Sequence, residues 1–313
     1  MKALVTGGAG FIGSHLAEAL CRRGARVVIV DDLSYGSLDN LAWRRPGDPV
    51  EFIQGDIANE EVIARALPGC DWVFHQAAVA SVPLSVAQPV ETNRTNLTAT
   101  LGLLAAANAA GVKRFVFASS SAIYGDSPAP RKRETDPPQP LSPYALQKYA
   151  SERYAQLFHA AHGLETVSLR YFNVFGPRQS FNSPYSGVIA RFCTAALAGQ
   201  PVTIFGDGHQ TRDFVYVDNV VAANLLVSEA PAAAVAGRYF NIAGGESISL
   251  RQLVEELARQ TGSNPAPRFE PARPGDVRHS SADLTAARAI GFDPKVTWQE
   301  GLARTLEFYR RGS

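Results

Sequence analysis

The sequence predicts an α/β protein with a doubly wound parallel sheet and a smaller, mixed α/β domain in its C-terminal half. Short apolar runs alternate with helical stretches through the first half of the chain. A glycine-rich turn joins the first run to the first helix. After Gly176 and Pro177 the strict alternation ends, and Pro and Gly punctuate the sequence. Strands separated by helices form parallel sheets covered on both faces, so the first half should contain the main sheet.

The glycine turn follows the first predicted strand, Lys2 to Val5, in the run Thr-Gly-Gly-Ala-Gly-Phe-Ile-Gly (residues 6–13). Gly7 permits a tight turn, Gly10 lets the backbone approach a diphosphate, and Gly13 lets the next helix pack closely on the strand. Phosphates bind at helix N-termini, so the backbone at Phe11 and Ile12 belongs to the same predicted site. This pattern predicts a dinucleotide-binding Rossmann unit.

An acidic residue ends the second predicted strand, which includes the apolar run from Val27 to Val30. A carboxylate at this position accepts hydrogen bonds from a ribose 2′-hydroxyl, so Asp31 favours NAD over NADP. Asp32 beside it is also explained as the cap of the following turn. The first strand, the glycine turn, the helix, the second strand and the acidic residue follow one another in the order of a dinucleotide-binding unit. NAD is therefore the predicted cofactor.

Further strands end near Gln54, His75 and Ala118. Ligands bind parallel sheets beyond the carboxyl ends of their strands, so the residues that follow should meet at one edge. This edge is predicted to hold Gly10, Asp31, Asp56, Ala77 and Ser121. His75 is interpreted as a buried strand histidine, because no nucleophile or metal partner lies near it in the sequence.

Tyr144 and Lys148 place a phenol and an ammonium four residues apart. On a helix this spacing puts both on one face. Tyrosine normally holds its proton to a pKa of about 10, and a neighbouring cation favours the phenolate. The pair is thus a candidate acid/base unit, although chance also produces this spacing. The helix from about Glu91 to Ala110 and the helix carrying Tyr144 have Ala/Leu faces that suit either a core or paired helices of a dimer.

The amino-acid composition of the chain limits the kinds of molecule that it is expected to bind. The chain has 313 residues, 46% of them hydrophobic, and a formal net charge of +1, which gives no general attraction to nucleic acid or to an anionic membrane. Cys21, Cys70 and Cys193 are far apart, and no His cluster accompanies them, so neither a disulfide framework nor a metal site is predicted. No uncharged run reaches membrane-spanning length. These features predict a cytoplasmic protein.

Six motifs together resemble the extended short-chain dehydrogenases/reductases, and within them the NAD-dependent nucleotide-sugar epimerases. They are the glycine turn, His-Gln-Ala-Ala (75–78), Ser-Ser-Ser-Ala-Ile-Tyr-Gly (119–125), Ser-Pro-Tyr-Ala-Leu-Gln-Lys (142–148), Arg-Tyr-Phe-Asn-Val-Phe-Gly-Pro (170–177) and Arg-Asp-Phe-Val-Tyr-Val-Asp-Asn (212–219). The resemblance covers the whole chain and is strongest to the 4-epimerases of UDP-N-acetylglucosamine and UDP-glucose.

The resemblance implies a catalytic triad of Ser121, Tyr144 and Lys148, with Asn96 and the turn at Ala77 and Ala78 helping to position NAD. It likewise implies that Asp31 binds the adenosine ribose and that Asp56 and Ile57 lie by the adenine. It implies that Tyr144 takes a proton from a sugar hydroxyl as hydride leaves carbon, that Lys148 lowers the pKa of Tyr144, and that Ser121 hydrogen-bonds the same oxygen. An epimerase then returns the hydride to the opposite face of a keto sugar. The cofactor is neither consumed nor released.

Related sugar dehydratases and decarboxylases carry an acid just after the catalytic hydroxyl residue, where this alignment has Ala122 and Ile123. Neither side chain transfers a proton, which argues against elimination and decarboxylation. Uronate epimerases similar to this chain commonly have Thr at Asn173, which argues mildly against a uronate. Asn173 is expected to reach a sugar or phosphate oxygen, or else to cap a turn.

The resemblance divides the chain into an NAD-binding domain, 1–175 with a returning segment near 214–243, and a nucleotide-sugar domain, 176–213 and 244–313. One strand of the first domain is expected to return near Phe240. The expected substrate contacts are Phe205 for uracil, Arg212 and Arg273 for diphosphate, and Asp276 for ribose, with Ser81, Val82, Ser121, Asn173, Val188 and Ser280 near the sugar. Arg278 fits this set less well and is also explained as a solvated charge.

Ser280 carries the prediction about substrate size. Family members restricted to non-acetylated hexoses commonly have tyrosine at this position, and serine leaves room beside the sugar C2 for an N-acetyl group. The alternative is that another loop fills this space. Ala190 replaces a proline found in many relatives.

The predicted activity is a UDP-hexose 4-epimerase, for UDP-GlcNAc/UDP-GalNAc and also UDP-Glc/UDP-Gal, in a homodimer. A UDP-glucuronate 4-epimerase and a net nucleotide-sugar oxidoreductase are the alternatives, and an intact triad argues against a non-catalytic NAD-sensing scaffold.

Overall fold

A computed structural model describes residues 1–180, 187–263, 265–272 and 278–311. Its centre is a seven-stranded parallel sheet with the order β10-β6-β5-β4-β1-β2-β3. The strands are β1 (Lys2–Thr6), β2 (Arg26–Asp31), β3 (Val50–Gln54), β4 (Trp72–His75), β5 (Arg114–Ser120), β6 (Glu165–Tyr171) and β10 (Arg238–Ile242). The strand order reverses between β1 and β4, which is the point where such sheets bind ligands.

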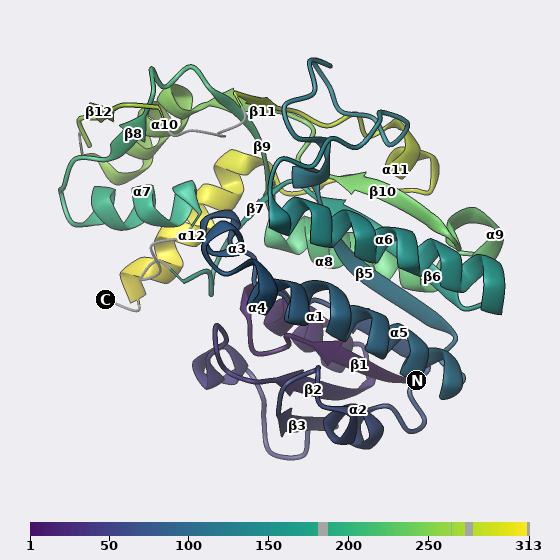
Figure 1. The fold of residues 1–313 in the computed structure, drawn as a ribbon. Helices are drawn as coiled ribbons and strands as arrows, with labels where there is room; N and C mark the ends of the chain where they lie inside the picture. Colours follow the sequence, from purple (N-terminus) through teal and green to yellow (C-terminus); the bar gives the residue numbers. More distant parts are fainter. Residues whose placement is uncertain (181–186, 264, 273–277, 312–313) are drawn as a thin grey trace.

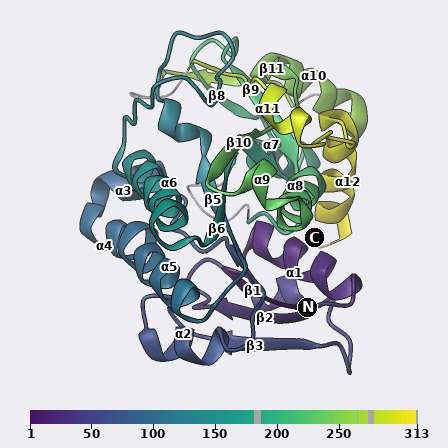
Figure 2. The same cartoon turned by 90° about the vertical axis from the view of Figure 1, so that its right-hand side faces the viewer.

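Helices cover both faces of this sheet (Figures 1 and 2). One face carries α1 (Phe11–Arg22) and α8 (Val217–Glu229), which pack against each other. The opposite face carries α2 (Glu60–Ala66), α5 (Ala99–Ala109) and α6 (Pro143–His162). The doubly wound α/β fold predicted from the sequence is confirmed.

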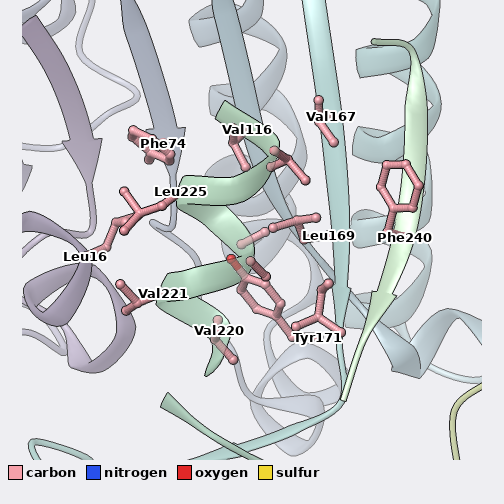
Figure 3. Packing of buried hydrophobic residues seen from close by; sticks show 14 of the residues in the cluster. Leu16, Phe74, Val116, Val167, Leu169, Tyr171, Val220, Val221, Leu225 and Phe240 are labelled. Atoms are coloured by element: carbon pink, nitrogen blue, oxygen red, sulfur yellow. The ribbon is translucent and has the colours of Figure 1, made fainter. Parts of the chain in front are cut away.

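Each face of the sheet has its own apolar core. Figure 3 shows the core under α1 and α8, where Leu16 and Val221 lie with Val116, Leu169 and Phe240 of the sheet. Because strands of a parallel sheet are buried on both faces, they are apolar almost throughout rather than alternating. This continuous burial makes the sheet a rigid support for the residues that follow its strands.

A second lobe lies beyond the carboxyl edge of the main sheet (Figure 1). It contains β7 (Asn173–Phe175), β9 (Thr211–Tyr216), β11 (Ser247–Ser249) and β13 (His279–Ser280) in one sheet, and β8 (Thr203–Phe205) paired with β12 (Arg268–Glu270) in another. The helices α7 (Val188–Leu197), α10 (Leu250–Thr261) and α12 (Trp298–Arg311) pack on them. The mixed second lobe is formed largely by the C-terminal half of the chain.

The chain passes between the lobes more than once. β7 follows β6 directly but pairs with β9 of the second lobe. After β9 the chain returns to the main sheet through α8, and β10 pairs with β6. The short elements α3 (Val82–Ala87), α4 (Pro89–Asn93), α9 (Ala232–Val235) and α11 (Thr285–Ala289) complete the fold, with 3-10 turns at Leu38–Leu41 and Ser121–Tyr124 and a π-helix at Arg94–Thr98. Among the described helices, none is long and apolar enough to cross a membrane.

Candidate active site

A cavity of about 830 Å³ lies at the carboxyl edge of the main sheet. Apart from Asn96, all the predicted cofactor-binding residues line it: Gly7, Gly10, Phe11, Ile12, Gly13, Asp31, Asp56, Ile57, Ala77, Ala78, Tyr144 and Lys148. The segments that follow β1, β2, β3 and β4 therefore meet there, as expected for the edge of a parallel sheet.

The glycine turn brings α1 close to β1. Gly7 has φ of 65°, a left-handed conformation that favours glycine. A Cβ atom on Gly13 would lie 2.1 Å from the carbonyl oxygen of Gly7, so only glycine allows this approach. Gly10 is the N-cap of α1 and supplies no side-chain cap, which leaves first-turn N–H groups to face an anion. The turn fits a dinucleotide diphosphate.

Asp31 ends β2 and is almost fully buried. Its two carboxylate oxygens accept hydrogen bonds from the backbone N–H groups of Ala9, at 2.9 Å, and Leu33, at 2.8 Å. Burial raises the pKa of Asp31, and these two hydrogen bonds oppose that rise. Each carboxylate oxygen retains a further acceptor site for a ribose hydroxyl. The fit to an adenosine ribose is therefore good.

Asp56 follows β3 and forms an ion pair with Arg94, 2.6 Å from carboxylate to guanidinium. Arg94 begins the π-helix that also carries Asn96. Asn96 does not line the cavity. Its side chain accepts from the N–H of Val79 at 2.8 Å and donates to the carbonyl of Val79 at 3.1 Å. Asn96 thus holds the segment after β4 that forms one wall of the cavity.

Tyr144 and Lys148 project from α6 toward the end of β5. The ammonium of Lys148 donates to the carbonyl of Ala118 at 2.8 Å and is almost completely buried. Tyr144 and Ser120 both line the cavity, and the Ser120 side chain acts on the Tyr144 phenol by lowering its pKa. The sequence prediction placed Ser121 beside Tyr144. The structure instead puts Ser120 there, because β5 ends at Ser120 and Ser121 begins a 3-10 turn outside the cavity lining.

The electrostatics of the pair also differ from the expectation that Lys148 lowers the pKa of Tyr144. Burial raises the pKa of Tyr144, and the polar side chain of Ser120 opposes that rise. Burial lowers the pKa of Lys148 to about 7. An ammonium with this pKa is only partly charged at neutral pH, so it stabilises a phenolate less than a solvated lysine of normal pKa would.

His75 is fully buried in β4, as predicted. Its two ring nitrogens pair with the hydroxyls of Thr6, at 2.7 Å, and Thr100, at 2.8 Å. Burial lowers its pKa to about 3, so the ring is neutral at physiological pH. His75 connects β1, β4 and α5 beneath the cavity.

The predicted sugar-nucleotide residues are less closely grouped. Ser81 caps α3 by accepting from the N–H of Leu84, and Val82 is 43% exposed. The Asn173 side chain donates to the carbonyl of Asp213, and Arg212 donates to the carbonyls of Thr211 and Arg278. Phe205 ends β8, Val188 begins α7 and Ser280 ends β13, and none of these predicted residues lines the cavity. Arg273 and Asp276 lie outside the described residues.

Sequence reasoning missed several residues of the cavity wall. The loop after β7 supplies Arg178 and Gln179, and α12 supplies Phe308 and Tyr309. Arg178 has φ of 65°, and its guanidinium pairs with Glu18 of α1. The Gly-Pro before Arg178 marks a turn, but no local pattern shows that α12 reaches the cofactor side of the molecule.

A Rossmann sheet, a glycine turn fitted to a diphosphate, and a Tyr-Lys pair at the same edge define an NAD-dependent enzyme of the short-chain dehydrogenase/reductase type. Residues 3–243 match the NAD dependent epimerase/dehydratase family. The chain belongs to this family, and NAD is its cofactor.

Relatives and solved structures agree with this assignment. The chain is 40% identical over 318 residues to the UDP-glucose 4-epimerase of Mycolicibacterium smegmatis, with 100% of both chains covered. It resembles the structure of UDP-glucose 4-epimerase with UDP-glucose from Thermotoga maritima (TM-score 0.94, 42% identity, 100% and 99% covered). It also resembles UDP-N-acetylglucosamine 4-epimerase from Methanobrevibacter ruminantium in complex with UDP-N-acetylmuramic acid (TM-score 0.93, 39% identity, 100% and 99% covered).

Proposed function

We propose that the protein is a 4-epimerase of UDP-hexoses that interconverts UDP-GlcNAc and UDP-GalNAc and also acts on UDP-Glc and UDP-Gal. The observation that carries this proposal is the convergence of Tyr144, Ser120 and Lys148 on one wall of the cavity that fits NAD. Relatives of this chain that are named UDP-glucose or UDP-N-acetylglucosamine 4-epimerases support it.

In the proposed reaction Tyr144 accepts the proton of the sugar C4 hydroxyl, and later returns a proton to the reduced oxygen. Ser120 takes the role first assigned to Ser121: its hydroxyl holds the same oxygen in line and stabilises the changing charge. Lys148 fixes α6 on β5 through the Ala118 carbonyl and supplies positive charge when protonated. NAD, held by the glycine turn and Asp31, would supply the acceptor for the C4 hydride and the source of its return.

With Ser120 as the reference, the two positions that follow it are Ser121 and Ala122. This differs from the sequence alignment, which put Ala122 and Ile123 there, but the conclusion is the same. None of these side chains is a carboxylic acid, so elimination and decarboxylation lack the extra acid/base group that they need. An epimerase needs no such group, because its single base acts on the C4 oxygen in both directions.

The proposed sugar-nucleotide site uses residues of the second lobe. Phe205 would contact uracil, Arg212 and Arg273 the diphosphate, and Asp276 the ribose. An arginine fork suits phosphate oxygens, and a carboxylate suits paired hydroxyls. Ser280 is partly buried and pairs with Arg212 in the β9–β13 ladder. A small side chain beside the diphosphate residue supports a pocket large enough for an N-acetyl group.

UDP-glucuronate epimerisation is the second candidate. A UDP-glucuronate 4-epimerase of Thermodesulfobacterium geofontis is 33% identical over 314 residues, with 97% of this chain and 95% of the relative covered. Asn173 argues mildly for the neutral sugars, because uronate epimerases similar to this chain commonly have Thr at this position. A net oxidoreductase differs from both epimerases, because it must release and exchange its cofactor.

The test is to give the purified enzyme UDP-GlcNAc, UDP-glucose and UDP-glucuronate separately and to resolve the products by NMR. The proposal predicts the C4 epimers of the first two substrates, with no net change at the nicotinamide absorbance band. If UDP-GlcNAc yields no UDP-GalNAc, the acetyl pocket at Ser280 is wrong. If UDP-glucuronate alone is converted, the second candidate replaces the first.

We further propose a division into an NAD-binding domain and a nucleotide-sugar domain, and a homodimer formed through paired helices. β6, the last strand of the main sheet before the chain first enters the second lobe, ends at Tyr171, which supports a boundary near residues 175 and 176. Exposed apolar side chains support the dimer: Leu146 and Leu157 on α6 are each 55% exposed, and Val90 on α4 is 78% exposed. Pairing of these helices would remove that apolar surface from water.

A further inference from the structure

A buried carboxylate lies on the same face of α6 as the Tyr144–Lys148 pair. Glu152 follows Lys148 by four residues, so Tyr144, Lys148 and Glu152 form one row along the helix. The side chain of Glu152 is 0% exposed. A carboxylate in such a place requires hydrogen-bonded partners.

The row on α6 contacts three consecutive residues at the end of β5. Tyr144 lines the cavity together with Ser120, Lys148 donates to the carbonyl of Ala118 at 2.8 Å, and the hydroxyl of Ser119 donates to Glu152 at 2.8 Å. Ser119 is the residue between the other two. The Ser119–Glu152 bond therefore ties the helix to the strand at the point where the strand presents Ser120.

Arg170 of β6 completes this arrangement. It is the cross-strand neighbour of Ser119, and its guanidinium donates to both carboxylate oxygens of Glu152, at 3.0 and 2.6 Å. Its side chain is 2% exposed. A two-pronged arginine–carboxylate pair fixes direction as well as distance. The carboxylate is thus held by neighbouring residues of two strands.

Arg170 is itself held in place. Its guanidinium lies 4.0 Å from the ring centroid of Tyr239 and 5.0 Å from that of Tyr124, and it donates to the Tyr124 hydroxyl at 2.7 Å. The Tyr124 hydroxyl donates in turn to Asn241 at 2.7 Å. Four different elements, β5, β6, β10 and the turn after β5, therefore determine where the Glu152 carboxylate stands.

We propose that Glu152, held by Arg170 and bonded to Ser119, is a positioning residue that sets the separation of Tyr144 from Ser120. The proposal rests on the proposed function, because it takes Tyr144 and Ser120 to be the catalytic pair. Catalytic groups must stand within about 0.5 Å of their working geometry. A helix that shifts along β5 by that amount would change the separation of the Tyr144 and Ser120 hydroxyls.

The same strands provide a matched control. Arg114 and Glu165 are cross-strand neighbours in β5 and β6 and also form an ion pair, but at the opposite end of the strands from the cavity. A change in Glu165 tests what the loss of a charge from a β5–β6 ion pair does to the fold. It leaves the end of β5 near Ser120 untouched.

The test compares Ser119→Ala, Glu152→Gln and the control Glu165→Gln with the wild-type enzyme. Ser119→Ala removes one hydroxyl and leaves the buried ion pair intact, so this variant should fold. The proposal predicts that Ser119→Ala and Glu152→Gln lower kcat by about ten-fold or more, since small misplacements of reacting groups have large effects on rate. KM for the UDP-sugar and the NAD content per chain should stay within about two-fold of wild type, and Glu165→Gln should keep a wild-type kcat.

A kcat for Ser119→Ala within two-fold of wild type would overturn the proposal, as would a fall in NAD content that matches the fall in kcat. Crystal structures of the wild type and Ser119→Ala give a readout independent of turnover. They should show the Tyr144 hydroxyl displaced from Ser120 by about 0.5 Å or more, and an unchanged separation would contradict the inference. If the wild type shows no epimerisation, the proposed function fails, while the structural comparison still decides the role of Glu152.

Discussion

Gly13→Ala should disrupt the cofactor site through a single methyl group. The added Cβ would lie 2.1 Å from the carbonyl oxygen of Gly7, 2.8 Å from its carbonyl carbon and 2.9 Å from the Cα of Gly8. All three neighbours are backbone atoms, so no side chain can move aside. Normal contact requires α1 to shift away from β1 by roughly 1 Å, and overpacking of this kind costs about 1–3 kcal/mol.

The shift acts on NAD binding directly, because the N-terminus of α1 is the predicted diphosphate site. We expect NAD affinity to fall by more than about ten-fold, since the backbone N–H groups at the start of α1 would no longer point toward the phosphates. NAD content per chain after purification, binding calorimetry and thermal unfolding measure this. The control is Gly102→Ala in α5, where an added Cβ has nothing within 4 Å. Wild-type NAD affinity and stability in Gly13→Ala would refute the close packing of α1 on the turn.

Three further predictions concern the catalytic pair and the assembly. Tyr144→Phe should abolish turnover while the enzyme retains NAD; surviving activity would reject Tyr144 as the base. Burial lowers the pKa of Lys148 from 10.5 to about 7, so the unfolded chain binds more protons between these values, and stability should rise with pH there by up to roughly 1.4 kcal/mol per unit. Denaturant titrations of NAD-free protein at pH 7 and 9 should show this rise, and Lys148→Met should reduce it. Leu157→Arg should convert the proposed dimer to a monomer in light scattering, and an unchanged mass would exclude that face of α6.

Much of the NAD-binding site could be predicted from the sequence, because its residues belong to local sequence patterns. The turn at Gly7 to Gly13 follows an apolar strand and opens a helix, so its place at the sheet edge follows from topology alone. Asp31 was found in the same way, as the acid that closes the second strand. Because parallel strands end at the same edge of the sheet, these residues come together without any need to know which distant residues are in contact.

The identity of the serine beside Tyr144 depends on a detail that the local sequence pattern does not contain. Three serines stand in a row at the end of β5, and the choice among them depends on the last residue of the strand. A shift of one position moves a side chain away from its partner. The pKa of Tyr144 also differs from the sequence prediction, because it depends mainly on how deeply the phenol is buried rather than on the spacing to Lys148.

The polar network of Glu152 was not predicted because its members are distant in the sequence. Glu152 alone looks like a surface charge on an amphipathic helix, and Arg170 looks like a charge within an apolar strand. Only the packing of α6 on β5 and β6 shows that they neutralise each other. The same limit applies to α12, whose Tyr309 reaches the cavity from the far end of the chain.

The central claim, reversible hydride transfer at C4 with Tyr144 as the base, is tested most directly by isotope labelling. UDP-glucose carrying deuterium at C4 should yield UDP-galactose that keeps the deuterium at C4. The same reaction of unlabelled substrate in D2O should introduce no deuterium at C4 or C5. Loss of the C4 label to solvent, or deuterium at C5, would show that the enzyme removes a carbon-bound proton and would contradict hydride transfer.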